Sequence, residues 1–187
     1  MASRTKLTDT ATLELYRIAL ENAETQPEIS AIMADLGYDS TVIADGKALL
    51  TKTRTAYDAN KTEDDETSAA YADFSSKKEQ LEDTFNIHRK KAKVVFRNDS
   101  LTAVQGKLSR LKISVDDLTA ANTLISELET ARAVYLKEKG ESQDATKGKD
   151  AAFAKIDDWM SEFYAVAKIG LEDNPQLLEA LGKTIRG

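Results

Sequence analysis

Arg17-Ile18-Ala19-Leu20-Glu21-Asn22 is a six-residue stretch whose pattern returns twice, as Lys93-Val94-Val95-Phe96-Arg97-Asn98 and as Lys168-Ile169-Gly170-Leu171-Glu172-Asp173. Each copy begins with a basic residue and an apolar residue. A small or apolar residue, an apolar residue and a charged residue follow, and the copy ends with Asn or Asp. The copies are offset by 76 and then 75 positions. A basic residue near the last carbonyls, followed by Asn or Asp, suits the end of a helix. We therefore interpret each copy as a joint where a long helix ends and a short capped helix follows.

The segments between the joints predict long amphipathic helices. Apolar residues recur at spacings of three and four over about 8–23, 40–60, 64–97, 115–139 and 144–172. The polar stretches at 61–66 and 140–144 predict turns between the long helices. Short helices are expected at about 28–36, from Ser100 to Leu111, and at 176–181. Pro27 suits the first turn of one of them, and Gly37 and Gly182 suit helix ends.

The order of short helix, long helix, turn and long helix occurs twice, which predicts an internal duplication of about 76 residues. The pseudo-repeat units span about 25–98 and 99–173, with partial units at 7–24 and 174–185. We expect a single all-α domain over residues 1–187. It would be an elongated helical bundle of two tandem long hairpins, with short connecting helices and coiled-coil-like packing.

Composition narrows the class of protein. The 187 residues carry a formal net charge of −6, with 41% apolar residues, 31% charged residues and no cysteine. Negative charge argues against nucleic-acid binding, because phosphate binding needs a field of the opposite sign. No apolar run approaches the ~20 residues that span a bilayer, and residues 1–6 lack the apolar core of a signal peptide. We expect a cytoplasmic protein; export that needs no cleavable signal stays open.

The sequence predicts no catalytic, cofactor or metal site. His88 is the only histidine, whereas a helical di-metal site needs Glu-x-x-His pairs on two helices. The acidic run Glu63-Asp64-Asp65-Glu66 lacks the Asp-x-Asp-x-Asp-Gly spacing of a calcium loop. A Gly-rich phosphate loop, a nucleophile elbow and a C-x-x-C pair are also missing from the sequence. We therefore expect a protein that is not an enzyme.

Two groups of residues are candidates for an interaction surface. Arg89, Lys90, Lys91 and Lys93 form a basic cluster near a predicted helix end. They either complement the helix dipole or meet an acidic protein partner, such as another copy of this chain. Trp159 and Tyr164 add aromatic surface to the last long helix, where they serve core packing or anchor a subunit contact.

The second half of the chain carries a resemblance. The stretches that carry it are Lys137-Glu138-Lys139-Gly140-Glu141-Ser142, Ile156-Asp157-Asp158-Trp159-Met160-Ser161-Glu162-Phe163-Tyr164-Ala165-Val166-Ala167-Lys168 and Asn174-Pro175-Gln176-Leu177-Leu178-Glu179-Ala180-Leu181-Gly182. Together, mainly over residues 137–182, they resemble small all-helical bacterial proteins of unknown function. The resemblance implies an all-α fold and a bacterial origin, and it implies no activity.

The leading hypothesis is a structural or scaffolding protein that acts through protein–protein contacts. It would be a self-associating subunit of a homo-oligomer, ring or filament, because a chain with partial units at both ends leaves incomplete faces that stacking covers. The alternative is a bundle that binds a small apolar ligand or cofactor. Its lining would be Tyr71, Phe74, Phe85, Trp159 and Phe163. A packed core would use the same residues, so the sequence leaves both hypotheses open.

Overall fold

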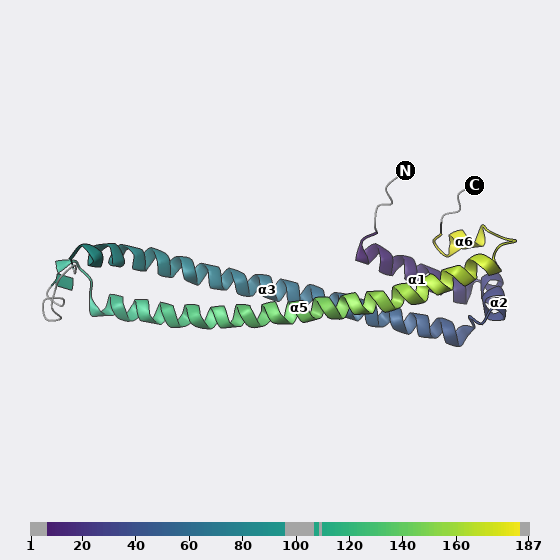
Figure 1. Cartoon of the computed structure of the whole chain (residues 1–187), viewed down its shortest axis with the longest axis horizontal. Helices are drawn as coiled ribbons and strands as arrows, with labels where there is room; N and C mark the ends of the chain where they lie inside the picture. The colour runs from purple at the N-terminus through teal and green to yellow at the C-terminus, as the bar shows by residue number, and fades with distance from the viewer. Residues whose placement is uncertain (1–6, 96–106, 109, 184–187) are drawn as a thin grey trace. The chain divides into compact units, whose positions relative to one another are not determined.

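The computed structural model describes residues 7–95, 107–108 and 110–183. In chain order its helices are α1 (Asp9–Thr25), α2 (Pro27–Asp35), α3 (Ser40–Val95), α5 (Val115–Gly170) and α6 (Leu177–Ala180) (Figure 1). The two long helices pack together, and the described residues contain no strand. The predicted all-α class is therefore confirmed.

The long helices α3 and α5 each run for 56 residues without a break. The turns predicted at 61–66 and 140–144 are therefore wrong, and four predicted long helices are in fact two. Neither segment contains a proline, and a glycine inside a helix costs only about 1 kcal/mol relative to alanine. The two segments contact each other instead: Ser142 Oγ donates to Asp64 Oδ1 at 2.7 Å. Next to them, Thr67 Oγ1 donates to the Glu138 carbonyl at 3.1 Å.

The chain divides into two compact units. Unit 1 consists of Met1–Lys61 and Ala145–Gly187, and unit 2 consists of Thr62–Asp144. This division differs from the predicted repeat units at 25–98 and 99–173, because α3 and α5 each contribute residues to both compact units. The tandem duplication stays a prediction.

Unit 1 has a continuous apolar core. Its fully buried members come from α1, α2, α3 and α5 and from the residues that follow α5 and α6: Ala19, Leu20, Ala23, Ile29, Met33, Ile43, Ile156, Met160, Phe163, Ala167, Leu171 and Leu181. Full burial of a large apolar side chain contributes about 1.5–3 kcal/mol. Burial of this set is therefore the main source of stability in unit 1.

Three helical turns end in the same backbone motif. In each, an amide donates to the carbonyl five positions earlier at 2.8–3.0 Å: Tyr38 to Met33, Ile113 to Leu108 and Lys183 to Leu178. The residue before the donor has positive φ each time, +89° at Gly37, +55° at Lys112 and +77° at Gly182. This is the Schellman motif. The helix ends predicted at Gly37 and Gly182 are confirmed.

Unit 2 pairs residues 62–95 of α3 with the residues of α5 up to Asp144, in antiparallel order. Tyr135 packs against both Tyr71 and Phe74, with ring centroids 5.3 and 6.0 Å apart. The buried apolar residues in the described part of unit 2 are Ile113, Ala121 and Ala131. Two helices alone cover little of each other, so large side chains of unit 2 stay in solvent. The short helix expected from Ser100 lies mostly outside the described residues.

Candidate interaction surface

Unit 2 carries a groove that is bordered by exposed apolar side chains. The groove measures about 480 Å³, and its lining comes from both helices: Phe74, Lys78, Leu81, Glu82, Leu128, Glu129 and Arg132. Tyr71 and Phe85 stand seven residues before and after Lys78, so they lie on the same side of α3. Ile125 and Leu136 stand seven before and four after Arg132, and Leu118 lies seven before Ile125.

These residues form one surface, which we call the apolar face. Its members are Tyr71, Phe74, Leu81, Phe85, Leu118, Ile125, Leu128 and Leu136. Tyr71, Phe85, Leu118, Ile125 and Leu136 are all exposed. Helical spacing places them on both borders of one groove, so they are contiguous rather than scattered.

The opposite side of unit 2 has a different character. A groove of about 560 Å³ lies there, lined by Ala70, Asp73, Lys77, Thr123, Ser126, Glu127, Thr130, Ala131 and Val134. Lys77 Nζ donates to Asp73 Oδ1 at 2.9 Å, and this hydrogen bond raises the pKa of Lys77. Of these lining residues Val134 alone is large and apolar. We call this side the polar face.

Charges of opposite sign collect toward the two ends of the described helices in unit 2. Exposed acidic residues lie at one end: Asp64, Asp65, Glu66 and Glu141. Exposed basic residues lie at the other: Arg89, Lys90, Lys91, Arg110 and Lys112. Residues 65 and 90 are about 38 Å apart along α3 at 1.5 Å per residue. This exceeds the ~8 Å screening length at physiological salt several times, so each end acts on a partner independently.

Three carboxylates at the acidic end lie close together. Oxygens of Glu63, Glu138 and Glu141 fall within 4.8 Å of one another, and Lys137 Nζ lies 3.3 Å from Glu138 and 2.6 Å from Glu141. The Oε2 atom of Glu63 is buried without a hydrogen-bond partner. Desolvation, followed by the charges of neighbouring glutamates, raises the pKa of Glu63. The cluster is an electrostatic cost to unit 2, and nothing about it besides its charge indicates a bound cation.

The predicted interaction residues lie in both units. Arg89, Lys90 and Lys91 are exposed in unit 2, and the side chain of Lys93 lies outside the described residues. Trp159 and Tyr164 lie in unit 1 and pack against its core. These two aromatic side chains therefore contact their own chain, as the core-packing interpretation expects.

The contacts of these two aromatic residues are specific. Trp159 stacks on Phe163 with centroids 5.5 Å apart. The Tyr164 hydroxyl donates to the Leu181 carbonyl at 3.1 Å, burial raises the pKa of Tyr164, and Lys183 Nζ lies 3.8 Å from its ring centroid. Tyr164 thus holds the C-terminal segment of unit 1 in place.

His88 is half-buried on α3 in unit 2. The carboxylate of Asp117 accepts hydrogen bonds from the Ser114 amide and hydroxyl, both at 2.8 Å. These bonds lower the pKa of Asp117, and the charges of His88 and Lys91 lower it further. His88 therefore lies near the start of α5 in unit 2.

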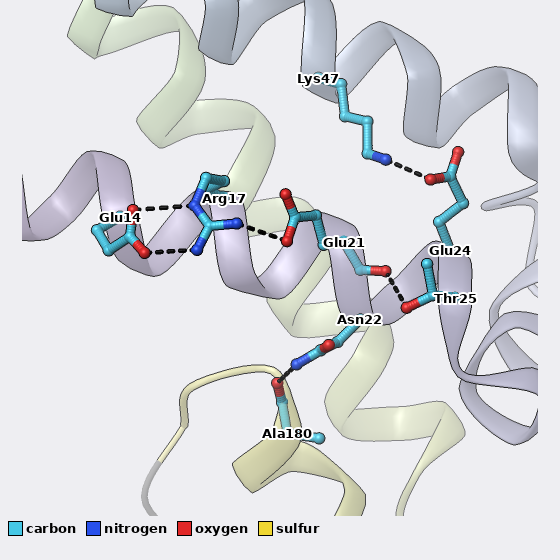
Figure 2. A network of polar contacts seen from close by, with 8 residues as sticks. All are labelled: Glu14, Arg17, Glu21, Asn22, Glu24, Thr25, Lys47 and Ala180. Atoms are coloured by element: carbon cyan, nitrogen blue, oxygen red, sulfur yellow. Dashed lines mark hydrogen bonds and ion pairs between the residues drawn. The ribbon is translucent and has the colours of Figure 1, made fainter.

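The two partial units predicted at the chain ends pack against each other within unit 1. Figure 2 shows Asn22 Nδ2 donating to the Ala180 carbonyl, at 2.6 Å, between α1 and α6. In the same view Arg17 lies between Glu14 and Glu21, and Lys47 pairs with Glu24. Leu20 and Leu181 are fully buried. Because α1 and α6 pack against each other, the partial units at the chain ends do not leave the open faces that the sequence-based hypothesis expected. Self-association therefore has to be argued from another surface.

Sequence reasoning missed the apolar face. Leu118, Ile125 and Leu136 recur at helical spacing, as core residues do, and their exposure depends on how few helices pack in unit 2. The signal that could have found them is the number of apolar positions on each helix, compared with the number of neighbouring helices that could cover them. Two helices cannot cover a wide apolar stripe on each.

The fold and this surface define an all-α protein with a long antiparallel helix pair. No protein-family model, curated protein sequence or solved structure matches the chain. The bacterial origin suggested by residues 137–182 therefore stays a prediction. Across residues 7–95, 107–108 and 110–183, no helix combines the length and apolar character needed to cross a bilayer.

Proposed function

We propose that this chain is a structural or scaffolding subunit that self-associates through the apolar face of unit 2. The observation that supports the proposal is the set of five exposed large apolar side chains that helical spacing places on that face. Soluble monomers rarely expose large contiguous apolar patches, and such patches commonly mark protein–protein contacts. A scaffold of this kind needs no catalytic residue, and the function rests on the surface alone.

The gain from covering the apolar face is of the same size as the cost of association. Full burial of one such side chain contributes about 1.5–3 kcal/mol, so covering the exposed half of five contributes about 4–7 kcal/mol. Two copies that cover each other double this figure. The cost of association is about 4–15 kcal/mol. Burial of the apolar face can therefore offset this cost.

The predicted tandem repeat fits the same proposal. The first residues of α3 and α5, Ser40 and Val115, are offset by 75 positions. Their N-terminal caps share that offset: Asp39 Oδ1 accepts from the amides of Thr41 and Val42, and Ser114 Oγ accepts from the amide of Asp117. Repeats of one helical unit are common in proteins that work through extended surfaces.

The alternative function, binding of a small apolar ligand, has less support. Of the residues predicted to line its pocket, Trp159 and Phe163 stack on each other in unit 1. Phe74 stacks on Tyr135 in unit 2, and Tyr71 and Phe85 are exposed there. These side chains thus belong to two separate units, and within them Trp159 packs on Phe163 and Phe74 packs on Tyr135.

Sedimentation velocity over a wide concentration series tests the proposal. We expect the native chain to exceed the monomer mass, and Leu136→Glu on the apolar face to weaken association by about tenfold or more, or about 1.4 kcal/mol. Val134→Glu is the matched control, since both residues lie on α5, at 53% and 46% exposure, on opposite faces. Circular dichroism checks that both variants fold. A native chain that stays monomeric at every concentration would overturn the proposal.

A further inference from the structure

We propose that the basic end of unit 2 binds the surface of an anionic lipid bilayer. The basic end is the set of exposed side chains Arg89, Lys90, Lys91, Arg110 and Lys112. None of them belongs to the apolar face, so this inference does not rest on the proposed self-association. The partner is a layer of negatively charged lipid headgroups above an apolar interior.

Positive charge is concentrated in one short part of an acidic chain. Residues 85–118 contain eight lysines and arginines against three aspartates, which gives this part a charge of +5. The other 153 residues contain 18 lysines and arginines against 29 aspartates and glutamates, which gives −11. A negatively charged surface therefore attracts this part of the chain and repels the rest.

The ends of two helices contribute to the basic end. Lys91 lies four residues before the end of α3, while Arg110 and Lys112 lie just before α5 begins (Figure 1). The charges of His88 and Lys91 act on Asp117 in the first turn of α5, which places the end of α3 near the start of α5. Basic residues that are about 20 positions apart in the sequence thus lie at the same end of unit 2.

The basic side chains of α3 point in several directions around the helix. Arg89, Lys90 and Lys91 are consecutive, and each residue turns an α-helix by about 100°, so the three together cover about 200° of its circumference. All three are exposed. A folded acidic protein would contact one side of such an end, whereas lipid headgroups can surround it. This arrangement favours a headgroup layer over a protein with a single binding face.

Exposed apolar side chains lie among these charges. Ile87 is 57% exposed, and Val115 is 76% exposed, the highest value for a large apolar side chain in the described part of the chain. Ile87 lies three residues before Lys90 and four before Lys91, so the three are neighbours on the surface of α3.

This combination of residues is typical of segments that bind at a membrane interface. There the apolar side chains enter the boundary of the acyl chains, while lysine and arginine meet the anionic headgroups. A nucleic acid offers negative charge without an apolar layer, so it would leave Ile87 and Val115 in water. The apolar side chains therefore favour a lipid surface.

Co-sedimentation of the full chain with lipid vesicles tests the inference. We expect binding to vesicles of phosphatidylcholine that contain about one third phosphatidylserine, and none to vesicles of phosphatidylcholine alone. Binding should fall by about tenfold or more when the salt is raised to about 0.5 M, because salt screens the attraction.

Charge reversal at the basic end should weaken vesicle binding. We expect a loss of about tenfold or more for Lys90→Glu with Lys91→Glu, since two side chains change from attraction to repulsion. Lys52→Glu with Lys155→Glu is the matched control, because the change in net charge is the same and both lysines are exposed in unit 1. Circular dichroism checks that both variants fold.

Removal of the apolar side chains should also weaken binding. We expect a severalfold loss for Ile87→Ser with Val115→Ser, because the variant keeps every charge but loses the contact with the acyl boundary. Ile169→Ser is the control, since Ile169 is 68% exposed in unit 1 and should leave binding unchanged.

The outcomes separate a lipid surface from other anionic partners. A chain that fails to bind the anionic vesicles at low salt would overturn the inference, and so would binding that Lys90→Glu with Lys91→Glu leaves intact. Binding of a DNA duplex or of poly-glutamate as tight as vesicle binding, with no effect of Ile87→Ser and Val115→Ser, would show attraction to any polyanion and overturn the lipid assignment. Leu136→Glu should still bind vesicles, so the proposed self-association and this inference fail separately.

Discussion

The indole ring of Trp159 lies so close to Gly46 that a Cβ atom on residue 46 would stand 2.5 Å from Cη2 of the ring. The ring stacks on Phe163 at 5.5 Å and meets Tyr38 edge-on at 5.7 Å. Because Phe163 and Tyr38 contact the ring on two further sides, the ring cannot move away from α3 unless the core of unit 1 repacks. The glycine is thus required for the close approach of α3 and α5 in this unit.

Gly46→Ala should destabilise unit 1. Overpacking of a filled core costs about 1–3 kcal/mol, while alanine in a helix returns about 1 kcal/mol, so we expect a net loss of up to about 2 kcal/mol in urea unfolding. Gly148→Ala on α5 of the same unit is the control, because a Cβ there meets nothing within 4 Å. The control should gain up to about 1 kcal/mol. Equal effects of the two variants would contradict the packing account.

Lys112→Gly should stabilise the protein. Lys112 has φ of +55°, a left-handed conformation that costs a residue with a side chain about 1–2 kcal/mol. Glycine adopts it freely. We therefore expect a higher melting temperature and a gain of about 1 kcal/mol in the free energy of unfolding. Gly37→Ala should lose a similar amount, and through the backbone alone, since Gly37 has open space around it. Unchanged melting of both variants would argue against the Schellman geometry at these positions.

Asn60 and Thr146 should be energetically coupled. Asn60 Nδ2 donates to Thr146 Oγ1 at 3.0 Å, and Asn60 is buried. Removing either partner leaves the other unsatisfied, so each single alanine variant should cost more than half of the double variant. A double-mutant cycle of Asn60→Ala and Thr146→Ala should give a coupling of about 0.5–1.5 kcal/mol. The distant pair Asn60→Ala with Ser161→Ala should be additive.

Glu63→Gln should stabilise unit 2 at neutral pH. The pKa of Glu63 is raised from 4.5, first by desolvation, so the folded state holds this proton more readily than the unfolded state does. Stability therefore falls as pH rises through the window from 4.5 to the raised value, and the unfavourable contribution is complete above it. The glutamine variant removes it. The advantage in melting temperature should be present at pH 7 and disappear below pH 4.5.

Asp65→Asn is the control for this experiment, as an exposed carboxylate near the same cluster. It should not reproduce the gain in melting temperature that Glu63→Gln gives at pH 7. A Glu63→Gln gain that persists undiminished in acid would show that side-chain volume, rather than charge, causes the effect.

The predicted joint at 93–98 reaches beyond the described residues. Around the other two joints, helix starts and ends were predictable from sequence because their signals are local. Thr8 caps α1 by accepting from the Ala11 amide, Pro27 begins α2, and Gly37 and Gly182 end helical turns. Capping chemistry and positive φ depend on a few neighbouring residues. Lys112 shows the limit of this reasoning. It has the same left-handed backbone conformation as the two glycines, but a lysine gives no sequence signal for it.

Local sequence could not show whether residues 61–66 and 140–144 form turns or continue the helices. A polar, charged stretch with a glycine is common to loops and to helix surfaces, and the difference is whether another helix offers partners. Asp64 Oδ1 accepts from Ser142 Oγ at 2.7 Å, and Thr67 reaches the Glu138 carbonyl. These contacts join residues 71–78 positions apart, which no local pattern contains.

The sequence by itself determined the all-α class, the capped joints and the amphipathic character of the helices, because helix formation and capping depend on residues within a turn or two of each other. The tertiary structure alone decided that α3 and α5 are continuous, that Trp159 and Tyr164 belong to a core, and that Leu118, Ile125 and Leu136 stay exposed. Burial depends on how many helices surround a side chain. That number is a property of the packed units, and the same apolar stripe is a core in unit 1 and an open surface in unit 2.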